Sequence, residues 1–400
     1  MRRPRRPRPG VVAISRPRHY PSLPNGPRPA APRDTASGAR SRKPGAEPPT
    51  EHPPANLAPT VMVVMTPQAG AAEIEAVVKR LEAAGVHAKV MPGELTTAIG
   101  AIGDPEGVRA LALEGMPGVD QVIPISRPYK LASSELSHHT RTTVEVDGRR
   151  VGGDAPFCLI AGPCTVESRA QTLNVADAVK PHATMLRGGA FKPRTSPFSF
   201  KGLGTEALGI LKEARERTGL PVVTELTDVN YAYELADAVD VIQVGARNMQ
   251  NYALLEVVGK LGKPVLLKRG LSSTLEELLM AADYILKEGN ERVMICERGI
   301  RTFETATRFT LDLGGVAWLK LHTHLPVIVD PSHAAGDRRL VTPFARAAAA
   351  VGADGIIVEV AEDPEAALCD GPQQLYASDF DAFARDVLAH AELVGRVPAV

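Results

Sequence analysis

The sequence predicts an α/β protein whose main part is a closed (β/α)8 TIM barrel. From Phe157 onward, short apolar segments alternate with amphipathic helical segments, and this unit repeats eight times. The apolar segments are nearly continuous in Val, Ile and Leu, as expected for parallel strands that are covered on both faces. Eight such units in about 240 residues fit a closed barrel better than an open doubly wound sheet. No G-x-G-x-x-G motif follows the first apolar segment, which disfavours a dinucleotide-binding sheet.

Residues 1–59 differ in composition from the rest of the chain. They carry fifteen prolines, and twelve Lys and Arg residues against three Asp and Glu residues, which leaves 34 against 43 in the remainder. This segment has too little apolar surface to offset its ordering entropy, so we expect a disordered basic tail. An upstream start codon placed too early, with Met62 or Met65 as the true start, is an alternative. A transit peptide is disfavoured because prolines interrupt the arginine-rich stretch.

Residues 60–131 are predicted to form a small ferredoxin-like α+β domain. Apolar strand segments are expected at 60–66, 86–93, 96–103 and 119–126, and helical segments at 71–85 and 104–115. This β-α-β-β-α-β order is the split pattern of a ferredoxin-like sandwich. The region contains no cluster of His, Cys or carboxylate side chains, so we expect no catalysis there.

Residues 132–154 are expected to form a linker and a β-hairpin, which turns at Asp147-Gly148. Residues 155–400 are predicted to form the catalytic barrel. Its predicted strands are FCLIAGP, TMLRGGA, PVVTEL, VIQVGA, PVLLKRG, VMICERG, PVIVDPS and GIIVEVA. Helical segments between them include residues 205–219, 251–262, 274–289 and 342–352.

Cationic residues gather at the carboxyl ends of the predicted strands, where the active sites of such barrels lie. At least six cations come from four strands or the loops that follow them, and this set comprises Arg187, Lys192, Arg194, Arg247, Lys268, Arg269 and Arg298. These charges would repel one another unless an anion joined them. Phosphate and carboxylate groups suit arginine and lysine, so we expect an anionic substrate at this rim.

Four potential metal ligands come from the first, seventh and eighth predicted strands and from the loop after the eighth, namely Cys164, His333, Glu359 and Asp370. In a closed barrel strand eight is a neighbour of both strand one and strand seven, so these side chains can converge. A thiolate, an imidazole and two carboxylates suit Mn²⁺, Fe²⁺, Co²⁺ or Zn²⁺. Taken singly, a buried cysteine is usually a small hydrophobic residue. The prediction therefore depends on the joint placement of the four.

The other three cysteines have simpler interpretations. Cys158 and Cys296 lie inside predicted strands and are expected to pack in the core, whereas Cys369 is a bystander beside Asp370. Four cysteines in 400 residues do not make a disulfide framework, which favours a reducing, cytoplasmic setting. No apolar stretch approaches the roughly 18 residues that a membrane span requires.

The segment from about Phe157 to Ala377 resembles the 3-deoxy-D-arabino-heptulosonate 7-phosphate (DAHP) synthases, of the microbial type with an N-terminal ferredoxin-like regulatory domain. The matching strings are AGPCTVES, LRGGAFKPRTSPFSFKGLG, QVGARNMQN, PVLLKRG, CERGIRTFE, VDPSHAAG and IIVEVAEDPEAALCDGPQQL. Residues from Thr60 to about Leu131 resemble the family's ferredoxin-like domain more loosely. The basic tail has no counterpart in the family pattern.

The resemblance implies a metal-dependent transferase that condenses phosphoenolpyruvate with D-erythrose 4-phosphate and water, releases phosphate, and opens the shikimate pathway of aromatic amino-acid biosynthesis. It implies metal ligation by Cys164, His333, Glu359 and Asp370, with manganese as the expected ion. It implies phosphoenolpyruvate binding by Arg187, Lys192, Ala246, Arg247, Lys268 and Arg298. Arg194 and Thr195 would then hold the sugar phosphate.

Three of these residues, Lys192, Cys164 and His333, are the expected catalytic groups. Lys192 is the candidate for proton transfer. Burial and the neighbouring arginines are expected to depress its pKa and so prepare it for that role.

Three other functions remain as alternatives. A 3-deoxy-manno-octulosonate 8-phosphate synthase shares the barrel and the phosphoenolpyruvate chemistry, but the string KPRTSP is of the heptulosonate type, whereas that relative carries a K-A-N-R version. A non-catalytic sensor with an inactive barrel is disfavoured because every ligand and anion-binding position is filled. A nucleic-acid binder would depend on residues 1–59, whose deletion leaves condensation unchanged if the chain is an enzyme.

The ferredoxin-like domain is expected to sense a pathway product, since in the family such domains confer feedback inhibition by tyrosine or phenylalanine. A passive contact between subunits is the alternative for this domain. The resemblance also implies a homo-oligomer, a tetramer, and neither a nucleic acid nor a membrane is an expected partner. The sequence leaves open the physiological metal, the effector, the place of residues 1–59 in the mature protein and any chorismate mutase partner.

Overall fold

The computed structural model describes residues 60–93, 96–103, 105–124, 128–135, 137, 140–192 and 198–396. The predicted disordered tail, residues 1–59, lies outside these ranges. Across the described part of the chain, no helix combines the length and the apolar character needed to cross a membrane.

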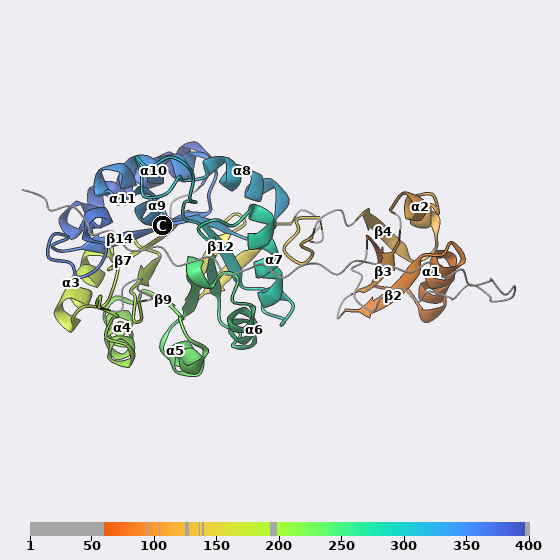
Figure 1. Ribbon diagram of the computed structural model, residues 1–400, viewed down its shortest axis with the longest axis horizontal. Helices are drawn as coiled ribbons and strands as arrows, with labels where there is room; N and C mark the ends of the chain where they lie inside the picture. The colour runs from red at the N-terminus through yellow and green to blue at the C-terminus, as the bar shows by residue number, and fades with distance from the viewer. Residues whose placement is uncertain are drawn as a thin grey trace, which may run out of the picture. The chain divides into compact units, whose positions relative to one another are not determined.

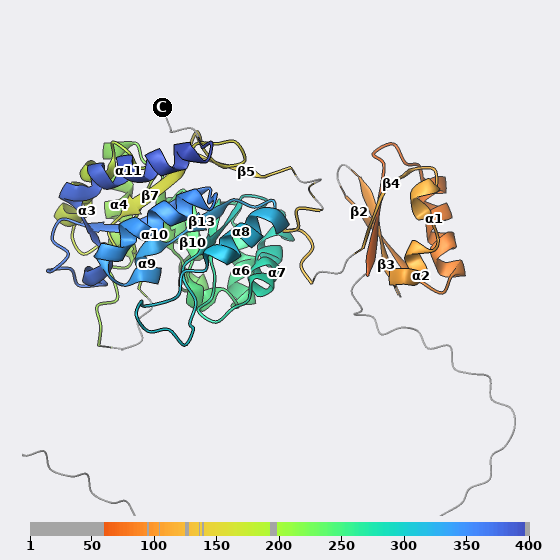
Figure 2. The same cartoon turned by 90° about the horizontal axis from the view of Figure 1, so that it is seen from above.

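The N-terminal elements form a ferredoxin-like α+β unit, as predicted. They are β1 (Val61–Met65), α1 (Ala71–Ala83), β2 (His87–Pro92), β3 (Thr97–Ile102), α2 (Pro105–Arg109) and β4 (Val119–Pro124). The antiparallel sheet has the order β2-β3-β1-β4, and both helices lie on one of its faces (Figure 2). The second predicted helix is shorter than expected. Ala112 adopts a left-handed conformation with φ of 49°, which separates α2 from the short helix η1 (Leu113–Gly115).

Eight parallel strands close into the predicted barrel (Figure 1). They are β7 (Cys158–Gly162), β8 (Met185–Arg187), β9 (Val222–Glu225), β10 (Val241–Val244), β11 (Val265–Lys268), β12 (Val293–Glu297), β13 (Val327–Val329) and β14 (Gly355–Ala361). Pairing of β13 with β14 and of β14 with β7 completes the ring. Strand β14 therefore lies between the strands that precede Cys164 and His333.

Helices surround this ring, as Figure 1 shows. They are α3 (Arg169–Val179), α4 (Thr205–Thr218), α5 (Ala232–Ala238), α6 (Tyr252–Lys260), α7 (Leu275–Leu286), α8 (Leu313–His322), α9 (Pro331–Ala335), α10 (Arg338–Ala350) and α11 (Phe380–Leu393). Helix α10 begins four residues before the predicted start at Thr342, because Asp337 caps it, and Pro343 lies inside the helix.

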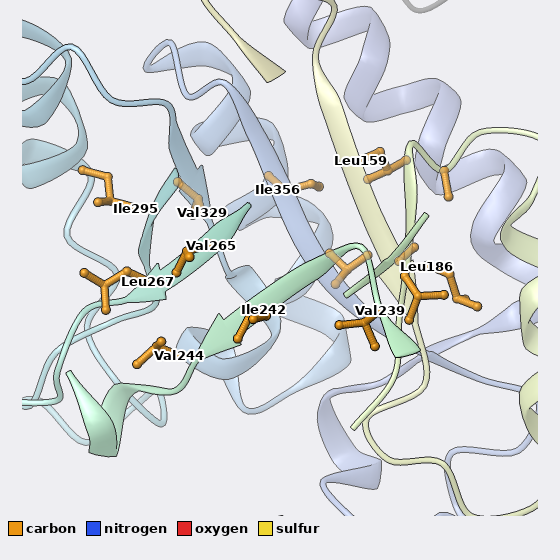
Figure 3. Close-up of a cluster of buried hydrophobic side chains, with 14 of the residues drawn as sticks. Leu159, Leu186, Val239, Ile242, Val244, Val265, Leu267, Ile295, Val329 and Ile356 are labelled. Atoms are coloured by element: carbon orange, nitrogen blue, oxygen red, sulfur yellow. The ribbon is translucent and has the colours of Figure 1, made fainter. Parts of the chain in front are cut away.

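Successive strand residues face opposite sides of the barrel wall, as strand geometry requires. In β7, Cys158 and Ile160 join the cluster inside the barrel, whereas Leu159 and Ala161 join the larger cluster between strands and helices. Figure 3 shows part of this outer cluster, with side chains from several neighbouring strands. Both faces of the strands are thus buried, which accounts for their continuous apolar sequence.

A β-hairpin closes the amino-terminal end of the barrel. Strands β5 (Thr143–Val146) and β6 (Arg149–Gly152) contribute Val144, Val146 and Val151 to the interior cluster. A Cβ added at Gly152 would lie 2.4 Å from Pro326, the residue before β13. Apolar side chains from the hairpin thus fill the barrel interior at this end.

Candidate metal and anion site

The residues predicted for the site lie at or after the carboxyl ends of the barrel strands. Arg187 ends β8, Lys268 ends β11, and Glu359 lies within β14. Loops and short helices carry the others, with Cys164 after β7, Lys192 after β8, Arg247 in η3 (Ala246–Asn248), Arg298 after β12, His333 in α9 and Asp370 before η4 (Gly371–Gln373). The closed ring brings residues that are more than 200 positions apart into contact, as for Cys164 and Asp370.

The four predicted metal ligands fall into two groups that share Asp370. His333, Glu359 and Asp370 form one group, and Cys164, Cys369 and Asp370 form the other. Within each group the potential ligand atoms lie within 4.8 Å of one another. The sequence predicted one set of four ligands, without Cys369. The position of Cys369 directly before Asp370 was the one sequence feature that could have indicated its place in this group.

Asp330 sets the protonation of His333. Nδ1 of the imidazole lies 2.7 Å from Oδ2 of Asp330, and the backbone N–H of His333 donates to Oδ1 of Asp330 at 2.9 Å. Burial lowers the pKa of His333, so the ring is neutral at physiological pH. A neutral ring with its proton on Nδ1, beside the Asp330 carboxylate, leaves the lone pair of Nε2 available, although the Nδ1 contact itself lacks hydrogen-bond geometry.

Nε2 of His333 faces another acceptor. Oε1 of Glu359 lies 3.5 Å away and is buried without a hydrogen-bond donor among the described residues. Burial alone would raise the pKa of Glu359, but the neighbouring cations, among them Arg187 and Lys192, hold it below its ordinary value. Two facing acceptors repel unless a cation lies between them. Their spacing suits a divalent ion with bonds of about 2.1 Å, so these residues fit a metal.

Lys192 contacts the first cysteine, with its Nζ atom 3.0 Å from Sγ of Cys164. Burial lowers the pKa of Lys192, but the charges of Cys164 and Glu359 outweigh this effect, and the net shift is upward. The expectation of a depressed pKa is therefore wrong. Cys164 and Glu359 belong to other β/α units than Lys192, so the sequence did not show that they lie close to it.

Three buried cations are available to an anionic ligand beside the metal group. Nη1 of Arg187 lies 3.2 Å from Oε1 of Glu359, but this ion pair lacks hydrogen-bond geometry, so the buried Nε and Nη1 atoms make no hydrogen bond within the described structure. Lys268 pairs with Asp330. Arg298 stacks on Phe309, 4.2 Å from the ring centre, and none of the described carboxylates lies within ion-pair distance of it. These donors can hold phosphate or carboxylate oxygens.

Two further residues support the metal group and were missed by the sequence analysis. Nε2 of Gln373 donates to Oε2 of Glu359 at 2.7 Å, and its Oε1 accepts from Arg308 at 2.7 Å. Arg308 also reaches Oδ1 of Asp370 at 3.2 Å. Gln373 follows Asp370 closely in the sequence, but nothing in the sequence indicated that Arg308 would lie here.

Several residues predicted for the anion-binding rim either lie outside the described residues or are not part of the buried group. Arg194 and Thr195, expected to hold the sugar phosphate, lie outside the described residues. Arg247 is exposed and Ala246 is half-buried in η3. Arg269 belongs to a separate buried group with Glu297 and Asp312, at 2.8 Å from each. Glu297 also accepts from the backbone N–H of Gly299 at 2.6 Å, so this group holds the start of the loop after β12.

Comparison with known proteins identifies the family. The model of the DAHP synthetase I family matches residues 137–394, and the model of the DAHP synthase ferredoxin-like domain matches residues 62–127. The chain belongs to the DAHP synthetase I family. It is thus an enzyme of the 3-deoxy-7-phosphoheptulonate synthase type, and both predicted folded domains have counterparts in the family.

The individual relatives include both a heptonate and an octonate aldolase. The phospho-2-dehydro-3-deoxyheptonate aldolase of Thermotoga maritima is 45% identical over 324 residues, which cover 81% of this chain and 94% of the relative. The crystal structure of a Thermotoga maritima DAHP synthase matches with a TM-score of 0.67 at 43% identity and covers 84% of this chain and 98% of its own. A 2-dehydro-3-deoxyphosphooctonate aldolase of Magnetococcus marinus is 33% identical, covering 59% of this chain and 88% of its own.

Proposed function

We propose that this DAHP synthase condenses phosphoenolpyruvate with D-erythrose 4-phosphate and water, using a divalent metal held by Cys164, His333, Glu359 and Asp370. One observation carries the proposal. Oε1 of Glu359 lies 3.5 Å from His333 and 3.2 Å from Arg187, so a single carboxylate joins the metal group to the buried anion-binding cations. The heptulosonate-type string KPRTSP and the name of the Thermotoga maritima relative favour the four-carbon sugar phosphate over a longer one.

The metal position has a defined chemical role in this proposal. A bound divalent ion would supply Lewis acidity toward the aldehyde oxygen of the sugar phosphate. Asp330 orients His333 and keeps its Nε2 atom free of a proton. Gln373 and Arg308 hold Glu359 and Asp370 in place. Manganese is the ion we expect, with iron, cobalt or zinc as alternatives.

The cations position and neutralise phosphoenolpyruvate. Arg187, Lys268 and Arg298 bind its phosphate and carboxylate, with Arg247 and the Ala246 backbone assisting, while Arg194 and Thr195 bind the phosphate of erythrose 4-phosphate. Carbon 3 of phosphoenolpyruvate attacks the aldehyde, water adds at carbon 2, and phosphate leaves by carbon–oxygen cleavage. Fixing two anions within attack distance supplies much of the rate enhancement.

Lys192 is the proposed proton donor. Its ammonium group lies beside Cys164, and its raised pKa means that it holds a proton before the reaction starts. It can therefore give this proton to the aldehyde oxygen as that oxygen gains negative charge. The expectation that burial and the neighbouring arginines depress the pKa of Lys192 does not fit this environment.

Phosphate release from phosphoenolpyruvate tests the proposal directly. We expect release with erythrose 4-phosphate, none after chelation of divalent metals, and recovery on addition of Mn²⁺. Arabinose 5-phosphate as the second substrate should give little or no release. Faster release with arabinose 5-phosphate would assign the chain to the octulosonate reaction, and full activity after exhaustive chelation would remove the metal from the mechanism.

The ferredoxin-like domain is the proposed site of feedback control. Its match to the family's regulatory domain supports this role, and an aromatic amino acid, tyrosine or phenylalanine, is the effector we expect. We also place the enzyme in the cytoplasm as a homotetramer. Titration of each aromatic amino acid into the phosphate-release assay tests the first point, and the mass in solution tests the oligomeric state.

A further inference from the structure

An aromatic ring covers the guanidinium of one anion-binding arginine. The guanidinium carbon of Arg298 lies over the ring of Phe309, 4.2 Å from its centre. Arg298 is only 6% exposed, and its Nη1 atom donates to the carbonyl oxygen of Gly299 at 3.3 Å. None of the described carboxylates forms an ion pair with Arg298, so the ring is the group that faces this buried charge.

Phe309 is held in this place by the loop after β12 and has no part in the core. It is half-buried and belongs to none of the apolar clusters of the described residues. Its backbone N–H donates to the carbonyl oxygen of Ala334 in α9 at 2.9 Å, and Ile300 and Thr310 exchange two hydrogen bonds of 2.9 Å. A Cβ added at Gly299 would lie 2.7 Å from Cβ of Phe309. The loop therefore folds back and brings the ring against Arg298.

This arrangement stabilises a buried cation without using its hydrogen-bond donors. An aromatic face attracts a guanidinium, and the attraction is stronger where water is excluded. Burial lowers the pKa of Arg298, so the charge gains from such a partner. The N–H groups point outward along the edge of the guanidinium plane, so a ring stacked on that plane leaves them available to an anion. A carboxylate in the same place would compete with the substrate for these donors.

We propose that Phe309 is a positioning residue for phosphoenolpyruvate, whose ring holds the guanidinium of Arg298 in the orientation that binds this substrate. The inference rests on the proposed function, in which Arg298 binds the phosphate or carboxylate of phosphoenolpyruvate. Orientation of Arg298 strengthens the bound substrate and the transition state alike. Loss of the ring should therefore raise the KM for phosphoenolpyruvate and leave kcat nearly unchanged.

The test compares Phe309→Leu, which keeps an apolar side chain without an aromatic face, with Phe309→Tyr, which keeps the face. Calorimetric titration of the Mn²⁺-loaded full-length chain with phosphoenolpyruvate alone should show binding weakened by about 5- to 30-fold in Phe309→Leu. Phe309→Tyr should stay within about twofold of wild type. In the phosphate-release assay, Phe309→Leu should raise the KM for phosphoenolpyruvate by a similar factor, with kcat and the KM for erythrose 4-phosphate within about threefold of wild type.

Phe303→Leu is the matched control, because Phe303 lies on the same loop, is 98% exposed and should leave every constant unchanged. Unaltered phosphoenolpyruvate affinity in Phe309→Leu overturns the inference, as does equal weakening in Phe309→Tyr. A fall in kcat with both KM values raised also overturns it, because it indicates general disruption of the loop.

Arg298→Met separates this inference from the proposed function. In that background Phe309→Leu should weaken phosphoenolpyruvate binding by less than about a further twofold, because the ring acts through the arginine. A full additional effect overturns the inference. Unaltered affinity in Arg298→Met rejects the proposed role of Arg298, and the role of Phe309 with it. A wild type that binds phosphoenolpyruvate but releases no phosphate rejects the proposed reaction, and the affinities of the Phe309 variants then support or overturn the inference by themselves.

Discussion

Nζ of Lys192 lies 3.0 Å from Sγ of Cys164, so a residue assigned to the anion rim touches one assigned to the metal. This contact couples the charges of the anion-binding residues to those of the candidate metal ligands. The charge of Glu359 helps to hold the proton on Lys192, and the ammonium in turn stabilises the negative charge of Glu359, whereas burial raises the pKa of the Cys164 thiol. Changes on either side should therefore be felt on the other.

Lys192→Met should reduce kcat by about 10²- to 10⁴-fold, because the variant loses both a proton donor and a buried positive charge. Steady-state phosphate release measures this effect. Lys212→Met removes an exposed lysine, paired with Asp237 on the surface, and should leave turnover unchanged. Near-normal turnover of Lys192→Met would end the proton-transfer assignment.

Asp330→Asn should weaken metal binding by about 10- to 100-fold. The asparagine amide can donate a hydrogen bond to Nδ1 of His333, which would place the proton on Nε2 and block that atom as a ligand. Calorimetric titration with Mn²⁺ measures the affinity without any need for turnover. Asp237→Asn is the surface control. An unchanged Mn²⁺ affinity would show that Asp330 serves only as the partner of Lys268.

Gln373→Met should also weaken Mn²⁺ binding, by about tenfold. The methionine fills a similar volume but can neither donate to Glu359 nor accept from Arg308, so both carboxylate ligands lose their support. Gln373→Glu keeps the acceptor for Arg308 and loses the donor to Glu359, and it should bind Mn²⁺ no better than the methionine variant. Wild-type affinity in both variants would remove Gln373 from the metal group.

The barrel strands and the convergence of the candidate metal ligands could both be predicted from the sequence. The eight strands could be predicted because burial on both faces leaves a continuous apolar signature in each. The convergence of the candidate metal ligands could be predicted because closure of the barrel makes the strands before Cys164 and His333 neighbours of β14. Neither inference required knowledge of side-chain directions.

Contacts between loops could not be predicted in the same way. Cys369 reaches Cys164, and Arg308 reaches Asp370, through loop conformations that no periodic pattern encodes. The pKa of Lys192 was misjudged for this reason. The arginines near it in the sequence were visible, but the acidic partners from other strands were not.

Lys320 should give the stability of the barrel a distinctive pH dependence. Its ammonium lies 2.6 Å from buried Asp354, and Arg141 and Arg396 approach the same carboxylate. Burial lowers the pKa of Lys320 from 10.5 to about 8. Between these two values the unfolded chain binds more protons than the folded chain, so this group makes the free energy of unfolding rise with pH.

Chemical denaturation of the wild type and Lys320→Met at about pH 7.5 and about pH 9.5 checks the sign. The wild type should gain stability relative to the variant at the higher pH. A difference between the two proteins that does not change with pH would show that the Asp354 ion pair keeps Lys320 protonated throughout.

Removal of the ferredoxin-like domain should abolish regulation and leave catalysis intact, provided that the truncated chain keeps the segment that begins at residue 128. Tyr129 is buried in the barrel core, and the backbone N–H groups of Lys130 and Ala132 donate to Asp283 of α7 at 2.5 and 2.7 Å. A chain that begins at residue 128 keeps these contacts. It should retain condensation and lose any response to aromatic amino acids.

A chain that begins at residue 140 should instead be unstable. Asp283, whose pKa is raised by burial, would lose both backbone donors, and the bridge between Ser133 and Thr323 would be absent. Two hydrogen bonds to a carboxylate are worth about 3 kcal/mol or more, which corresponds to a fall in Tm of about 6 °C or more for a barrel of this size. Differential scanning calorimetry of the two truncations compares them directly. Equal Tm values would mean that residues 128–139 do not stabilise the barrel, and a retained amino-acid response in either chain would move the effector site away from the ferredoxin-like domain.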